Sequence, residues 1–100
     1  MEKADKIILG IDPGTTIMGY GIIRVKGKSE IEMIEMGALH LSKYPDHALK
    51  LKKIYDRCLQ LIETHEPDVM AVEAPFFGKN VQSMLKLGRA QGVAFAAALS

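Results

Sequence analysis

Two short apolar runs, each of which ends in a carboxylate residue, most constrain the fold that this chain can adopt. The first run extends from Lys6 to Asp12 and the second from Asp68 to Glu73. Short runs rich in isoleucine and valine are typical of strands that are buried on both faces. A proline follows each carboxylate within two residues, and proline interrupts a hydrogen-bonded strand. Each acidic side chain is therefore predicted to lie at the carboxyl end of a buried strand.

The pattern between these runs changes from strand to helix. Ile17 to Lys26 and Glu30 to Leu41 are predicted strands joined by a tight turn, and a slip in the apolar alternation indicates a bulge near Met33 or Ile34. From Asp46 to Glu66 apolar residues recur every three or four positions, as an amphipathic helix requires, and a proline ends this helix. A last helix is predicted from Val81 to Leu99, with Asn80 as its cap.

The order strand, strand, strand, helix, strand, helix predicts one mixed α/β domain over residues 1–100. Strands one to three form an antiparallel meander, and strand four returns parallel to strand one through a helical crossover, with helices covering the faces of the sheet. If strand four pairs with strand one, Asp12 and Glu73 lie side by side at one edge. Open α/β sheets bind ligands at such an edge.

Composition limits the remaining function classes. The formal net charge of +1 gives no general support for nucleic-acid binding, so such a function must rest on local clusters. Cys58 is the only cysteine, which excludes an internal disulfide and fits a buried thiol in a reducing cytoplasm. The longest apolar run, Val93 to Leu99, is too short to span a bilayer, and the charged N-terminus does not resemble a secretory signal.

Asp12 and Glu73 together suit a divalent cation. Mg²⁺ takes oxygen ligands and is commonly held by one or two carboxylates, and a pair of such ions can drive phosphodiester hydrolysis. Taken residue by residue, an alternative stays open, in which Asp12 caps its turn and Glu73 forms a surface ion pair.

Several segments together resemble one known family. They are Leu9 to Thr15, Gly19 to Ile23, Val72-Glu73 with Phe76, Lys79-Asn80, and Leu85 to Ala94. In this order and at these separations they resemble RuvC, the family of bacterial Holliday-junction resolvases. The resemblance implies an RNase H-like fold, a homodimer, and cleavage of four-way DNA junctions that depends on Mg²⁺, with two ions per site and Mn²⁺ as a substitute. It also implies cooperation with the RuvA and RuvB branch-migration proteins.

The resemblance assigns roles to individual positions. Asp12 matches the first catalytic carboxylate of the family and Glu73 the second, both as metal ligands. Phe76 matches an aromatic residue that stacks on bases near the crossover, although a core phenylalanine is the alternative. Phosphate contacts are expected for Lys79, Lys86 and Arg89. The alternative is that these residues only form a solvated helix face.

One departure from the family concerns the metal ligands. The family completes its site with two further acidic residues from a C-terminal helix, and these 100 residues contain no such segment. The small-residue helix also runs to Leu99 and Ser100 without a capping signal. We therefore expect a C-terminally truncated chain that is inactive, or nearly so, by itself.

Three other functions compete with this interpretation. The opening from Gly10 to Thr16 also resembles the phosphate loop of actin-like ATPases and sugar kinases, but those domains are longer and give no reason for Glu73. A YqgF-like nuclease that acts on RNA shares the RNase H fold. In the third alternative the chain is a non-catalytic module that pairs through the helix from Val81 to Leu99.

Overall fold

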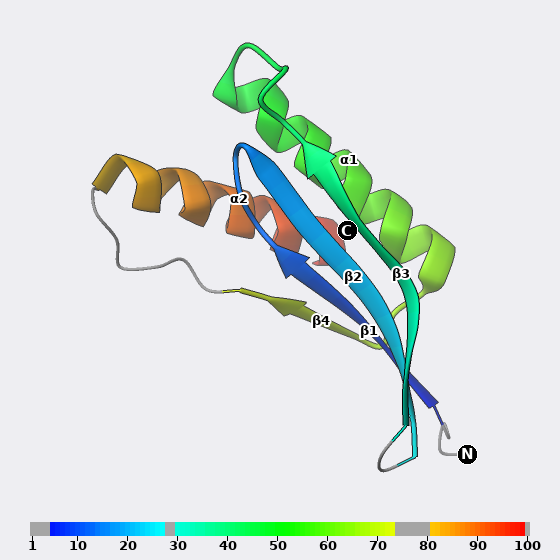
Figure 1. The fold of residues 1–100 in the computed structure, drawn as a ribbon. Helices are drawn as coiled ribbons and strands as arrows, with labels where there is room; N and C mark the ends of the chain where they lie inside the picture. The colour runs from blue at the N-terminus through cyan, green and yellow to red at the C-terminus, as the bar shows by residue number, and fades with distance from the viewer. Residues whose placement is uncertain (1–4, 28–29, 74–80, 100) are drawn as a thin grey trace.

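The structure is a computed structural model, and it describes residues 5–27, 30–73 and 81–99, with side chains in the last range described from residue 89 onward. The elements are β1 (Asp5–Asp12), β2 (Ile17–Lys26), β3 (Glu30–His40), α1 (His47–His65), β4 (Val69–Val72) and α2 (Val81–Leu99). The sheet order is β3-β2-β1-β4. Neighbouring strands β1, β2 and β3 are antiparallel, whereas β4 runs parallel to β1 (Figure 1). The predicted mixed sheet is thereby confirmed.

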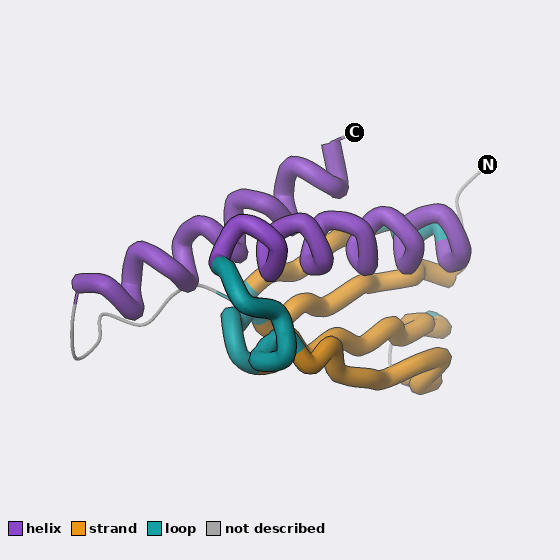
Figure 2. The backbone as a smooth tube through the Cα atoms, turned by 90° about the horizontal axis from the view of Figure 1, so that it is seen from above, coloured by secondary structure: helices purple, strands orange, loops and turns teal. Residues whose placement is uncertain are grey.

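Both helices lie on the same face of the sheet (Figure 2). On that face Leu9 of β1 is paired with Ile22 of β2, and both side chains are fully buried with Ile54 of α1. The prediction that the strands are buried on both faces is wrong for the part of the chain that the structure describes. Ile8 is only half-buried and Val69 is 41% exposed, because neither helix covers the opposite face.

Helix α1 begins and ends at the residues that its sequence predicts. The Asp46 side chain accepts a hydrogen bond of 2.7 Å from the backbone N–H of Leu49, which caps the first turn. Glu66 adopts a left-handed conformation with φ of 46° and closes the helix directly before Pro67. Cys58 is fully buried in the core, as the apolar spacing predicts.

The small residues of α2 allow this helix to pack closely. Ala90, Ala94 and Ala97 are buried in the common core, where α2 contacts α1 and β4. Helix α2 therefore packs against its own domain. Of the helices described, none combines the length and apolarity needed to cross a membrane.

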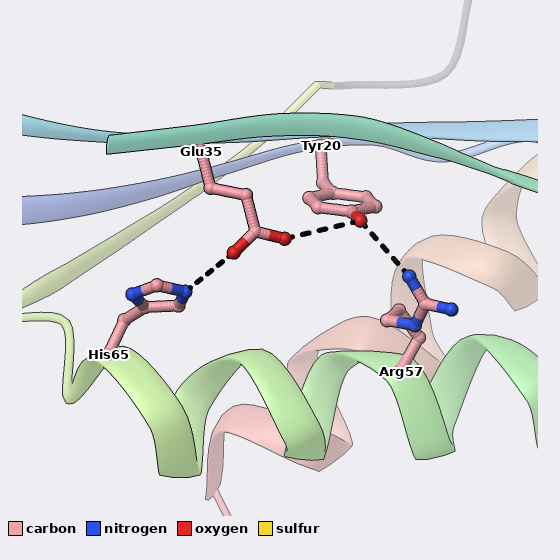
Figure 3. A network of polar contacts seen from close by, with 4 residues as sticks. All are labelled: Tyr20, Glu35, Arg57 and His65. Carbon is pink, nitrogen blue, oxygen red and sulfur yellow. Dashed lines mark hydrogen bonds and ion pairs between the residues drawn. The ribbon is translucent and has the colours of Figure 1, made fainter. Parts of the chain in front are cut away.

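A polar network fastens α1 to the sheet (Figure 3). Arg57 of α1 donates a hydrogen bond of 3.0 Å to the Tyr20 hydroxyl, and its guanidinium lies 5.7 Å from the centre of that ring. The Tyr20 hydroxyl in turn donates to Glu35 of β3 over 3.4 Å. His65, in the last turn of α1, lies 2.9 Å from the other Glu35 oxygen. The network therefore joins α1 to both β2 and β3.

A bulge in β3 turns Glu35 toward this network. The register shifts between Ile22, which faces Glu35, and Ile23, which faces Met33, so that Ile34 is the extra residue. The bulge predicted near Met33 or Ile34 is confirmed. Because a bulge reverses the alternation of faces, Glu35 lies on the same side of the sheet as Tyr20.

Candidate active site

The parallel pairing of β1 with β4 brings Asp12 and Glu73 together. In that register Ile11 faces Val72; Asp12 is the last residue of β1, and Glu73 directly follows β4. The backbone N–H of Glu73 donates a hydrogen bond of 3.0 Å to the Ile11 carbonyl, which extends the ladder by one step. Both carboxylate side chains are exposed at the edge of the sheet. The sequence-based prediction that they lie side by side is confirmed.

The Asp12 carboxyl group perturbs that of Glu73. A hydrogen bond with Asp12 and the repulsion of its negative charge raise the pKa of Glu73, and burial adds the smallest part. Two carboxylates at one place cannot both be ionised without cost, and an opposite charge between them removes that cost. A cation bound between the two side chains would therefore be attracted by both. This arrangement favours the interpretation of both residues as metal ligands. It disfavours the alternative in which Asp12 caps its turn and Glu73 forms a surface ion pair.

A shallow trough of about 640 Å³ extends from the carboxylates across the open face of the sheet. Its floor is formed by Gly10, Gly19 and Gly21, with Ala71 on β4 beside them. A Cβ atom at Gly19 would lie 3.6 Å from the Asp12 Cβ, so any longer side chain there would crowd the carboxylate. Glycines within strands mark places where another group approaches the backbone closely. The floor thus leaves room for a ligand beside the acidic pair.

The turn after Asp12 depends on Gly14. A Cβ atom at this position would overlap the carbonyl oxygen of Ile17, so only glycine fits. The neighbouring Thr16 carbonyl accepts a hydrogen bond of 2.8 Å from the backbone N–H of Leu41, which follows β3. These contacts fix the loop that carries Asp12 into β2, and they join it to the segment leading into α1.

The residues present fit a divalent metal ion but supply few ligands. Carboxylate oxygens are the donors that Mg²⁺ prefers, and Asp12 and Glu73 provide them at one edge. Over residues 5–27, 30–73 and 81–99 there is no group of three or more histidine, cysteine or acidic side chains that could hold a metal. Two carboxylates would leave most of the octahedral shell to water or to substrate oxygens.

The remaining predicted residues are placed only in part. Phe76 and Lys79 lie outside the described residues, and Lys86 lies in α2 but its side chain is not among those described. Arg89 is exposed on α2. Its role in phosphate binding stays a prediction.

Sequence reasoning missed Gln91. Its side-chain amide nitrogen lies 3.4 Å from the Glu73 carbonyl oxygen and so links α2 to the end of β4. A glutamine in an alanine-rich helix carries no signal that would have shown this contact. The glycine floor did carry a signal, because Gly19 and Gly21 recur with strand period inside a predicted strand.

Comparisons with known proteins match nearly the whole chain. The family model described as crossover junction endodeoxyribonuclease RuvC matches residues 8–100. The chain is 66% identical over 99 residues to the RuvC of Cytophaga hutchinsonii, covering 99% of this chain and 49% of that protein. It is 68% identical to the RuvC of Bacteroides fragilis over 96 residues, covering 96% of this chain and 50% of that protein. The chain thus spans about half the length of these curated relatives.

A solved structure shows the same fold. It is the structure of T. thermophilus RuvC in complex with a Holliday junction substrate, and it superimposes with a TM-score of 0.87 at 29% sequence identity. The match covers 94% of this chain and 57% of that chain. The arrangement of β1, β4 and the helices described above is therefore one that a junction-bound protein also has.

Proposed function

Because the chain belongs to the RuvC family of crossover junction endodeoxyribonucleases, we propose that the whole protein cleaves four-way DNA junctions at the Asp12 and Glu73 edge. The observation that carries this proposal is the side-by-side placement of the two carboxylates by the β1 and β4 ladder. The family match over residues 8–100 favours this function over a sugar kinase or an actin-like ATPase. The name of the family, with its deoxyribonuclease activity, favours DNA over the RNA substrate of a YqgF-like enzyme.

In this proposal the chain's own residues hold and orient the reacting groups. Asp12 and Glu73 would hold the metal, and Mg²⁺ bound there would supply an activated water and stabilise the leaving oxygen of the phosphodiester. The glycine floor leaves the approach to the pair open, and the Gly14 turn fixes the backbone of Asp12. We propose that the remaining acidic ligands come from the part of the whole protein that lies outside these 100 residues.

We further propose that the whole protein is a homodimer in the cytoplasm that acts with RuvA and RuvB. A twofold dimer presents the same site twice and so accounts for symmetric nicks in a four-way junction. The exposed side of α2 supports dimer formation. Phe95 is 45% exposed and Leu99 is 87% exposed. A Cβ atom added at Gly92, on the same helix, would have no neighbouring atom within 4 Å. In this view Phe76, Lys79, Lys86 and Arg89 contact the DNA.

Asp12→Asn in the whole protein tests the proposed function. The change keeps the size of the side chain and removes its charge, so the metal is held and polarised less well. A loss of about 3 kcal/mol of transition-state stabilisation slows cleavage roughly a hundredfold. The assay is single-turnover cleavage of a synthetic four-way junction in Mg²⁺, with junction binding measured in parallel by gel shift.

Asp56→Asn is the matched control. It removes the same charge from an exposed aspartate of α1 that pairs with Lys52, and cleavage should stay at the wild-type rate. If Asp12→Asn binds junctions and cuts them as fast as the wild type, the catalytic role given to this edge of the sheet is wrong.

A further inference from the structure

A row of basic side chains runs along one flank of α1 and the turn before it. It consists of Lys43, Lys50, Lys53 and Arg57, which we call the basic row. Residues three and four apart on a helix are neighbours on its surface, so Lys50, Lys53 and Arg57 follow one another. Arg57 bonds to Tyr20, which places the row on the side of α1 that faces β2 and β3. From the sequence alone, the overlapping cluster Lys50, Lys52, Lys53 and Arg57 is most simply the solvated side of its helix.

The charges of the three lysines are not neutralised within the part of the chain that is described. No carboxylate there forms an ion pair with Lys43, Lys50 or Lys53, whereas Lys52, which points elsewhere on the helix, pairs with Asp56 at 2.9 Å. The carboxylate of Asp46 lies one turn before Lys50, but it already accepts the N–H of Leu49 as the helix cap.

One aromatic ring lies beside two of these charges. The ammonium groups of Lys43 and Lys53 each lie 5.4 Å from the centre of the Tyr44 ring. Each contact is favourable, and no carboxylate of the described residues forms an ion pair with either lysine. The turn that carries Lys43 is fixed, since the Tyr44 N–H donates a hydrogen bond of 3.1 Å to the Leu41 carbonyl. The lysines are thus presented from a defined backbone.

The basic row begins at the same edge of the sheet as the carboxylate pair. The backbone N–H of Leu41 donates to the Thr16 carbonyl, and His40 pairs with Ile17, so the start of the row adjoins the loop that follows Asp12. A polyanion held at Lys43, where the row starts, would therefore lie near the loop that follows Asp12. Duplex DNA has this character, with one negative charge per ~1.7 Å of axis.

We propose that the basic row is a second DNA-binding surface, which holds the phosphate backbone of a duplex arm while the junction centre occupies the Asp12 and Glu73 edge. The proposal rests on the proposed function for the nature of the DNA, but its evidence is independent of the carboxylates. Lysine contacts to phosphates position a duplex and carry no sequence information. The surface therefore contributes affinity and orientation, not the choice of cleavage sequence.

The test compares two triple variants of the whole protein that remove equal charge. In Lys43→Gln, Lys50→Gln, Lys53→Gln the basic row is neutralised, and in Lys6→Gln, Lys26→Gln, Lys52→Gln three lysines elsewhere are changed. Junction affinity is measured against salt concentration by fluorescence anisotropy, and thermal unfolding checks that both variants are folded. Each lost phosphate contact lowers the magnitude of the slope of log K against log salt by about 0.9. The slope of the row variant should therefore be smaller than that of the wild type by roughly 2.7, and the slope of the control should change much less.

The possible outcomes separate this inference from the function itself. If the wild type binds and cleaves junctions, and the row variant has the wild-type salt slope, the inference is overturned and the proposed function stands. The inference is likewise overturned if both triple variants lose slope equally, because the loss then reflects net charge and not this surface. If the wild type neither binds nor cleaves junctions, the proposed function fails and the inference fails with it. A selective loss of slope in the row variant supports the inference.

Discussion

Replacing Gly37 of β3 is predicted to be destabilising because the Tyr20 ring occupies the place that a side chain would take. A Cβ atom at Gly37 would lie 2.5 Å from the Tyr20 hydroxyl oxygen, 2.7 Å from Cζ and 3.2 Å from Cε2. In Gly37→Ala the hydroxyl must move from 2.5 to 3.4 Å, a shift of about 0.9 Å, before the contact becomes an ordinary one. That shift acts directly on the 3.0 Å bond from Arg57 and the 3.4 Å bond to Glu35.

The expected cost is that of forcing an extra carbon into a packed site, about 1–3 kcal/mol. Alanine is otherwise more favourable than glycine inside a strand by roughly 0.5–1 kcal/mol. Whether Gly37→Ala raises or lowers the free energy of unfolding therefore depends on whether the Tyr20 ring is present. The measurement is the free energy of unfolding in urea for Gly37→Ala in three backgrounds of the whole protein. Those backgrounds are the wild type, Tyr20→Phe and Tyr20→Leu.

The three backgrounds separate the ring from its hydroxyl. Tyr20→Phe keeps the ring carbons that lie closest to position 37, so Gly37→Ala should still be destabilising there. Tyr20→Leu removes the ring, and Gly37→Ala should then be neutral or stabilising. An equal cost in the wild type and in Tyr20→Leu would refute the reasoning, since the destabilisation would then have nothing to do with the ring.

Two further predictions concern the core. Leu9→Ala should lower the free energy of unfolding by about 2–5 kcal/mol, because Leu9 is fully buried; urea unfolding measures this, and Val69→Ala, at a position 41% exposed, should cost clearly less. Burial raises the pKa of the Cys58 thiol from 9.0 to about 11, so at pH 8 its reactive thiolate is about a hundredfold scarcer than that of an ordinary cysteine. Alkylation at pH 8 should therefore be slow in the folded protein and fast in urea, and rapid labelling of a protein that is still folded would contradict the buried placement.

The sequence predicted those features that local patterns determine. The bounds of β2 and the ends of α1 follow from periodicity, from the Asp46 cap and from Pro67, all of which act within a few residues. The pairing of β4 with β1 is longer in range, but a strand-helix-strand crossover has few alternatives. For that reason the neighbourhood of Asp12 and Glu73 was predictable although the two residues are far apart in the chain.

Features that depend on which face a helix covers were not predictable in this way. Apolar residues such as Ile8 and Val69 look like core residues in the sequence, yet they lie on the face that neither described helix covers. The network of Tyr20, Glu35 and His65 is also invisible to pattern, because its partners are separated by 15 and 30 residues and meet only after the β3 bulge has turned Glu35.

The glycine floor and the carboxylate pair are best explained together. Glycine inside a strand is less favourable than alanine by roughly 0.5–1 kcal/mol, so Gly10, Gly19 and Gly21 together lower the stability of the sheet by about 1.5–3 kcal/mol. That is a large part of the roughly 5–15 kcal/mol that holds a typical domain folded. No close packing requires all three, since Cβ atoms at Gly10 and Gly21 would meet their nearest neighbours only at 3.8 and 4.0 Å. The absence of side chains along this row is explained if the space above it has to stay open for a substrate that reaches Asp12.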